Sequence, residues 1–217
     1  MPAPRFWLIA GPNGAGKSTL VRGEPLRDLL PVIHPLNADD WTLHSLQQRG
    51  YDSFRDAPPA VLVRTFVEAS DAVFGEVVAR LEKGEAVCVE TVLSTDKYCP
   101  VVNQVAAAGG VDIAGLIFLG YPLHPPGNPE KLRDAHLPAI KAPMLFVQGA
   151  RDAFGTPEEL RPVIKRIKAP VELCAIEDAD HSLKVPKKAS RSQTEVDALV
   201  LDTIVTWIQR KVLKAAR

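Results

Sequence analysis

Residues 144–152 read MLFVQGARD, an apolar run that turns polar at Gln148 and reaches Asp152 three residues after the glycine. Residues 171–181 read VELCAIEDADH, a second apolar run that ends in acids and is followed by His181. Runs of this kind are typical of strands buried on both faces of a sheet. Between them lies TPEELRPVIKRI, a predicted helix with Thr156 as its N-cap. The stretch therefore predicts two parallel strands joined by a helix, with Asp152 and His181 at successive strand ends.

The same alternation of strand and helix runs through the chain. Four further apolar runs are predicted strands: residues 5–10, 31–40, 86–91 and 113–120. Three-and-four-residue spacing of apolar side chains predicts helix from residue 41 to residue 84, and residues 192–217 form a predicted amphipathic helix. We expect an α/β fold: one three-layer α/β/α domain over residues 1–217, with a six-stranded parallel sheet.

Composition limits the partners. The 217 residues include 26 Lys and Arg and 26 Asp and Glu, so the net charge is zero, and bulk electrostatics favours neither nucleic acid nor an anionic membrane. Every apolar run is too short to span a bilayer, and the first is too short for a signal peptide. Three widely spaced cysteines are typical of free thiols in a reducing compartment, so we expect a cytoplasmic protein.

A glycine-rich turn follows the first strand. Residues 11–18 read GPNGAGKS, which fits the phosphate-binding pattern G-x-x-x-x-G-K-[ST] between a strand and a helix. In such a loop backbone N–H groups surround the β-phosphate, Lys17 reaches the β- and γ-oxygens, and the Ser18 hydroxyl binds Mg²⁺. The alternative is a glycine-rich turn with a chance lysine. The expected ATP-binding residues are Gly11, Pro12, Asn13, Gly14, Ala15, Gly16, Lys17, Ser18 and Thr19.

Acidic residues at two other strand ends are candidates for phosphoryl-transfer chemistry. Asp39 and Asp40 close the second strand and Glu90 closes the third, where parallel strands present ligand-binding side chains. Asp39 or Asp40 could accept a proton from a substrate hydroxyl, and Glu90 could orient substrate or a metal-bound water. The alternative is that all three are ordinary residues of turns.

The stretches LIAGPNGAGKST, PLNADDW, QQRG, GEAVCVETVLST and DKY, between Leu8 and Tyr98, resemble the zeta-toxin family of P-loop kinases. This resemblance implies phosphorylation of a sugar-nucleotide or another small hydroxyl substrate by ATP, with catalytic roles for Lys17, Asp39 as the general base, and Glu90. The sequence has nothing that matches the segment whose arginines hold the ATP phosphates in that family. We therefore expect nucleotide binding with weak or no kinase activity.

The second half has a different resemblance. GLIFLGYPLHPPGNPEKLRDAHL, PMLFVQGARDAFGTPEEL and ADHSLKVPK, from Gly115 onward, resemble dienelactone-hydrolase-like α/β hydrolases. The resemblance implies that Asp152 orients His181, and that His181 deprotonates a serine on a G-x-S-x-G turn. No serine of this sequence lies in that pattern. We therefore expect Asp152 and His181 to be relics of a catalytic triad.

The two resemblances meet near residue 112 without a linker. Together they imply the strand order 2-3-1-4-5-6, in which the kinase-like half gives 2-3-1 and the hydrolase-like half adds strands 4, 5 and 6. We infer an engineered chimera of two half-folds, residues 1–112 and 113–217, with a natural hybrid as the alternative. The main functional prediction is thus a P-loop protein that binds ATP and Mg²⁺. The alternatives are an α/β-hydrolase-like esterase, which the missing serine disfavours, and a folded scaffold without activity.

Overall fold

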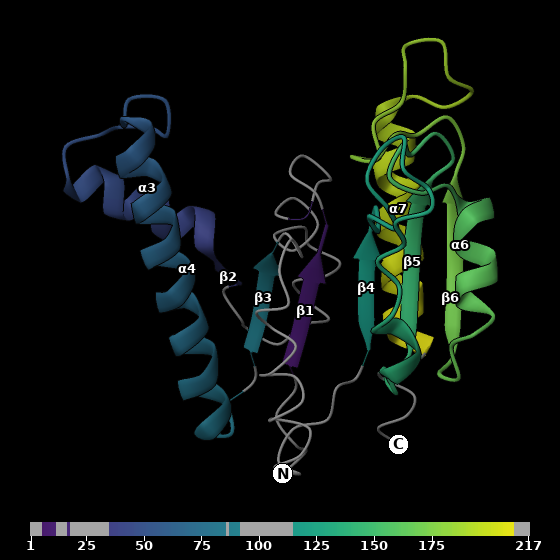
Figure 1. Cartoon of the computed structure of the whole chain (residues 1–217), viewed down its shortest axis with the longest axis horizontal. Helices are drawn as coiled ribbons and strands as arrows, with labels where there is room; N and C mark the ends of the chain where they lie inside the picture. The colour runs from purple at the N-terminus through teal and green to yellow at the C-terminus, as the bar shows by residue number, and fades with distance from the viewer. Residues whose placement is uncertain (1–5, 12–16, 18–34, 86, 92–114, 211–217) are drawn as a thin grey trace. The chain divides into compact units, whose positions relative to one another are not determined.

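The structure is a computed structural model that describes residues 6–11, 17, 35–85, 87–91 and 115–210. Six strands form one sheet in the order β2-β3-β1-β4-β5-β6, and every pair with a defined register is parallel (Figure 1). The sequence prediction of strand order 2-3-1-4-5-6 is confirmed. The strands are β1 Phe6–Ala10, β2 Leu36–Asn37, β3 Val87–Thr91, β4 Leu116–Leu119, β5 Met144–Gly149 and β6 Val171–Ile176.

The chain divides into two compact units. Of the described residues, 6–7, 35–85 and 87–91 belong to the first unit, and 8–11, 17 and 115–210 belong to the second. Along the chain, the units divide between residues 7 and 8, between 32 and 33, and between 112 and 113. The helix predicted after the glycine-rich turn has its residues 18–34 outside the described part of the chain.

The first unit contains two helices, α3 (Ala38–Gln48) and α4 (Pro59–Glu82), which pack against each other. Asn37 caps α3, because its Oδ1 accepts a hydrogen bond from the backbone N–H of Asp39 at 2.8 Å. Helix α4 also contacts β2 and β3, and its C-cap Lys83 is followed by Gly84, which has a φ of +72°. Its buried side chains recur at every fourth position: Thr65, Ala69, Val73, Val77 and Leu81.

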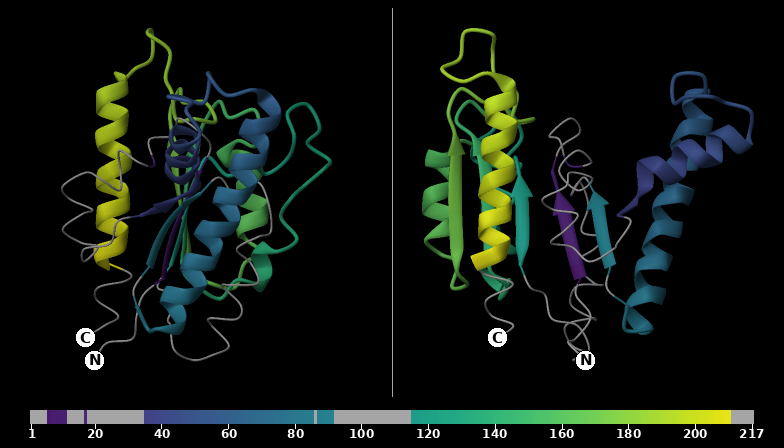
Figure 2. Two further views of the ribbon diagram at one scale, coloured as in Figure 1. Left: turned by 90° about the vertical axis from the view of Figure 1, so that its left-hand side faces the viewer. Right: turned by 180° about the vertical axis from the view of Figure 1, so that it is seen from behind.

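The second unit has helices α6 (Pro157–Ile164) and α7 (Gln193–Ile208), which lie on opposite faces of β4, β5 and β6 (Figure 2). Every residue of β5 is buried, as expected for a strand covered on both faces. Both helices begin with a capping box, formed by Thr156 with Glu159 and by Ser192 with Glu195. The predicted N-cap at Thr156 is confirmed.

The long connection between β4 and β5 is irregular except for one 3₁₀ turn, η2 (Leu137–Ala139). Tyr121 anchors this connection, because its hydroxyl donates to the carbonyl oxygen of Arg133 at 2.6 Å. The two cysteines among the described residues are free thiols: Cys88 is buried in β3 and Cys174 is half-buried in β6. None of the helices in the described residues is long and apolar enough to cross a membrane.

Candidate active site

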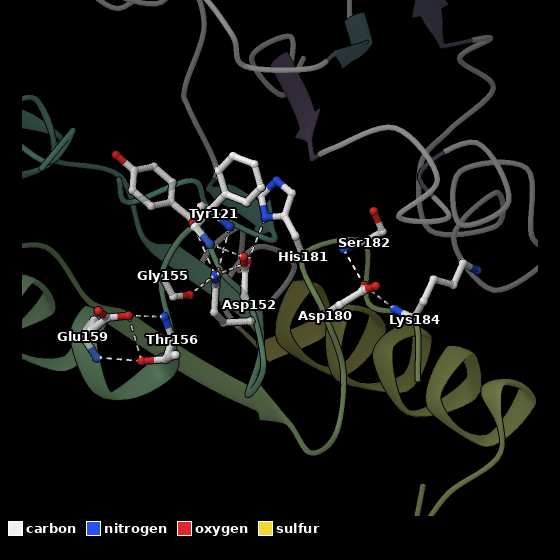
Figure 3. Close-up of polar contacts among 11 residues, drawn as sticks. Tyr121, Asp152, Gly155, Thr156, Glu159, Asp180, His181, Ser182 and Lys184 are labelled. Carbon is white, nitrogen blue, oxygen red and sulfur yellow. Dashed lines mark hydrogen bonds and ion pairs between the residues drawn. The ribbon is translucent and has the colours of Figure 1, made fainter. Parts of the chain in front are cut away.

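Asp152 and His181 meet beyond the carboxyl ends of β5 and β6. The two strands are paired as far as Gly149 and Ile176, so the turns that follow them begin side by side. The Nδ1 atom of His181 lies 2.8 Å from Oδ2 of Asp152 (Figure 3). A carboxylate can only accept hydrogen bonds, so Nδ1 is the donor in this pair. The structure thus brings together the two residues that the sequence placed at successive strand ends.

The carboxylate of Asp152 is buried, with 2% of the residue exposed. Its Oδ1 atom accepts a hydrogen bond from the backbone N–H of Phe154 at 2.8 Å. Its Oδ2 atom accepts two hydrogen bonds, one from Nε2 of Gln148 at 2.6 Å and one from the imidazole of His181. Burial of a carboxylate is costly unless donors satisfy it. These three donors hold the carboxylate in one orientation.

The imidazole of His181 is more accessible, with 20% of its side chain exposed. The ring of Phe154 stacks on it, with the two centroids 4.2 Å apart and an angle of 27° between the planes. Because Nδ1 is engaged by Asp152, Nε2 is the nitrogen that can exchange a proton with a substrate or a water molecule.

The turn that carries His181 is internally braced (Figure 3). Oδ1 of Asp180 accepts the backbone N–H groups of Ser182 and Lys184, both at 2.9 Å. Leu183 is buried and has a φ of +59°, a left-handed conformation that is uncommon for a leucine. These hydrogen bonds restrict the backbone of the turn and therefore hold the imidazole of His181 in a defined position.

The predicted kinase residues are divided between the two units. Asp39 and Asp40 lie in the first turn of α3, and Glu90 is buried on β3 beside Asn37 of β2. Lys17 is also buried, but it belongs to the second unit, so neither unit by itself contains the predicted site.

Two members of the predicted phosphate loop, Gly11 and Lys17, are described, and the other predicted loop residues lie outside the described residues. Gly11 sits against β4: an added Cβ would lie 2.7 Å from the carbonyl oxygen of Leu119. No group of three His, Cys, Asp or Glu side chains within the described ranges is placed to hold a metal ion. Whether ATP and Mg²⁺ bind stays a prediction from the sequence.

Sequence reasoning missed Gln148 and Phe154, which both contact the pair. Gln148 had a visible signal, because it is the polar residue that ends the apolar run of β5. A buried amide in a strand of this kind needs hydrogen-bond partners, and the nearest carboxylate along the chain is that of Asp152.

The structure has a hydrogen-bonded Asp–His pair at the carboxyl ends of two successive strands of a parallel sheet. This arrangement is typical of the α/β hydrolases. The sequence model of one family, described as "Alpha/beta hydrolase domain", matches residues 100–209, which are 110 of the 217 residues. The chain belongs to this α/β hydrolase family.

Three solved structures show low sequence identity to this chain. A provisionally assigned kinase from Chloroflexus aurantiacus has 11% identity and a TM-score of 0.50, with 100% of both chains covered. The esterase domain of a Rhodothermus marinus protein has 11% identity and a TM-score of 0.46, with 97% of this chain and 88% of that chain covered. Dienelactone hydrolase from Anabaena variabilis has 13% identity and a TM-score of 0.40, with 97% and 87% covered. The first likeness shows the fold alone.

The main functional prediction is therefore wrong. The chain was expected to be a P-loop, or Walker A, nucleotide-binding protein: an engineered chimera with weak or no zeta-toxin-like kinase activity. The family match instead assigns the chain to the α/β hydrolases through the half that contains Asp152 and His181. The physical reason for the error is that both folds place a glycine-rich turn between a central strand and a helix. The position of GPNGAGKS between a strand and a helix therefore does not distinguish a P-loop kinase from an α/β hydrolase.

Proposed function

We propose that the chain hydrolyses carboxylic esters, with His181 as the general base and Asp152 as the group that orients it. The observation that supports this most directly is the 2.8 Å contact between Nδ1 of His181 and a buried carboxylate oxygen of Asp152. This contact fixes the tautomer, so the lone pair lies on Nε2, where a proton can be taken up. The proposal replaces the expectation that the pair is a relic.

The attacking oxygen comes from water, because no serine of the sequence lies in a G-x-S-x-G pattern. Nε2 of His181 removes a proton from a water molecule while the water oxygen adds to the ester carbonyl carbon. The tetrahedral intermediate then collapses, the bond to the leaving oxygen breaks, and the imidazolium returns the proton to the departing alcohol. The products are a carboxylic acid and an alcohol, and His181 is regenerated without a covalent intermediate.

The test is hydrolysis of p-nitrophenyl acetate by the wild type, by His181→Ala and by Asp152→Asn. Both variants are expected to lose the protein-dependent rate, because one removes the base and the other removes the charge that holds its tautomer. His44→Ala is the matched control, since His44 is on α3 in the first unit, and this variant is expected to keep the wild-type rate. Equal rates for wild type and His181→Ala would overturn the proposal.

Burst kinetics and active-site labelling test whether water is the nucleophile. Direct attack by water predicts linear product formation without a burst, and no labelling by a fluorophosphonate, which modifies activated serines. A stoichiometric burst together with a labelled serine would show that a side-chain hydroxyl is the nucleophile, and would overturn the water step.

A further inference from the structure

Gln148 is a polar side chain near the carboxyl end of an apolar strand. It is the next-to-last residue of β5, it pairs with Ala175 of β6, and it is 0% exposed. The amide makes four hydrogen bonds within the second unit, three to backbone groups and one to Asp152. A fully buried amide with this many partners is held in one rotamer.

The partners define which end of the amide faces which group. The carbonyl oxygen Oε1 accepts the backbone N–H of Tyr121 at 2.8 Å. The nitrogen Nε2 therefore faces acceptors: Oδ2 of Asp152 and the carbonyl oxygen of Gly155, both at 2.6 Å, and the carbonyl oxygen of Tyr121 at 3.2 Å. An amide nitrogen has two hydrogens, so the two shorter contacts are its principal bonds. One of these bonds ends on the carboxylate that orients His181.

This contact bears directly on the orientation of the carboxylate. Oδ2 of Asp152 is shared between Nε2 of Gln148 and Nδ1 of His181, while Oδ1 is held by the N–H of Phe154. With a donor on each oxygen, the carboxylate plane is fixed, and the second lone pair of Oδ2 points toward the imidazole. The amide of Gln148 carries no charge. It can therefore donate a hydrogen bond to the Asp152 carboxylate without forming an ion pair that would compete with protonated His181.

We propose that Gln148 is a positioning residue for the Asp152–His181 pair: it fixes the Asp152 carboxylate against the backbone of Tyr121 and Gly155 so that Oδ2 faces Nδ1 of His181. This proposal rests on the proposed function, since a positioned general base requires that His181 acts as one. Gln148 itself does not touch substrate.

The first test replaces Gln148 by methionine, which has a similar length and no donor. Gln148→Met is expected to lower kcat about 10- to 100-fold, the usual effect of removing a group that orients a functional side chain, with KM within about twofold. Gln48→Met is the matched control, because Gln48 is an exposed residue of α3, and this variant should keep the wild-type kcat.

The second readout is the NMR signal of the proton on Nδ1 of His181, assigned by its absence in His181→Ala. The wild type should show a downfield signal that is slow to exchange, and Gln148→Met should shift it or broaden it beyond detection. A purely structural role for Gln148 would lower Tm and leave this signal in place. Because the signal does not depend on turnover, it tests positioning even if the wild type proves to have no His181-dependent hydrolysis, which would overturn the proposed function alone.

A near-isosteric variant keeps the test decisive if Gln148→Met does not fold. In Gln148→Glu, one carboxyl oxygen can still accept from Tyr121, while the other faces Oδ2 of Asp152, so a proton must be shared between them. The Nδ1 signal and kcat, relative to wild type at the same pH, should both fall as the pH rises and this proton is lost. Wild-type signal and kcat at every pH in both variants would overturn the positioning role.

Discussion

The backbone of Gly149 packs directly against that of Asp180: a Cβ atom added to Gly149 would lie 2.3 Å from the carbonyl oxygen of Asp180. Gly149 is the last residue of β5, and Asp180 immediately precedes His181. The same two turns are joined by a hydrogen bond from the N–H of Arg151 to the carbonyl oxygen of Ala179, at 2.8 Å. The absence of a side chain at position 149 therefore allows the two turns to approach closely enough for Asp152 to reach His181.

The first prediction is that Gly149→Ala lowers both stability and His181-dependent hydrolysis. The new methyl group must push the His181 turn away, because backbone oxygens cannot move aside as a flexible side chain can. We expect a loss of about 1–3 kcal/mol in the free energy of unfolding, measured by urea denaturation. In the folded fraction, the Nδ1 signal of His181 should be weakened.

Gly75→Ala is the control for this substitution. Gly75 lies in α4, and a Cβ there would meet nothing within 4 Å, so alanine should raise stability by about 0.5–1 kcal/mol through its better helix propensity. If Gly149→Ala behaved like Gly75→Ala and kept the full hydrolytic rate, the close approach would have no role in setting the pair.

The second prediction concerns acid stability. The backbone N–H of Thr156 is the main cause of a lowered pKa for the carboxyl of Glu159, and the Ser192 hydroxyl is the main cause for Glu195. A carboxyl whose pKa is lower in the folded state stabilises the fold above its unfolded pKa, about 4.3, and this stabilisation is lost as pH falls toward the folded value. We therefore expect the free energy of unfolding to fall on acidification from about pH 5 to pH 3.

Replacing both capping carboxyls by glutamine should flatten this dependence. Glu159→Gln with Glu195→Gln keeps the capping geometry, because a glutamine side chain can also accept from the N-cap backbone, but the titration is removed. Glu158→Gln is the matched control, since Glu158 is an exposed neighbour on α6 that is not part of the box. Urea denaturation at several pH values measures the slope, and an unchanged slope in the double variant would contradict the assignment.

Much of the fold could be predicted from the sequence because the local signals agree with the tertiary structure. The apolar runs at β1, β5 and β6 match the strands almost to the residue, and Thr156 followed by Pro157 marks the start of α6. These signals depend on burial and capping, which act on nearby residues. The order of β4, β5 and β6 follows the chain, since consecutive parallel strands are usually neighbours, whereas the order 2-3-1 came from the resemblance of the first half to P-loop kinases.

The site was less predictable for a physical reason. The sequence placed Asp152 and His181 at adjacent strand ends, but their hydrogen bond depends on Gly149 and Gln148, whose contacts are made across the sheet. A glycine reveals a close approach only when its spatial neighbours are known. The glycine-rich stretch after β1 was misleading in the opposite way, because its local pattern fits a phosphate loop while the family match assigns the chain to the α/β hydrolases.

The last prediction concerns the contact that seats α7 on the sheet. A Cβ on Gly115, the residue before β4, would lie 2.4 Å from Cη2 of Trp207 and 3.0 Å from its Cζ3. Trp207 is 1% exposed, so its ring cannot swing into solvent without uncovering the core. Gly115→Ala should therefore cost about 1–3 kcal/mol of stability by overpacking.

Trp207→Phe tests whether that cost comes from this contact. The smaller ring leaves a cavity and should be destabilising alone, but it removes the atoms that an alanine at position 115 would strike. The double variant should thus be more stable than the sum of the two single effects by about 0.5–3 kcal/mol. Denaturation of the wild type and the three variants gives this coupling energy, and strictly additive effects would show that Gly115 is required for another reason than the packing of Trp207.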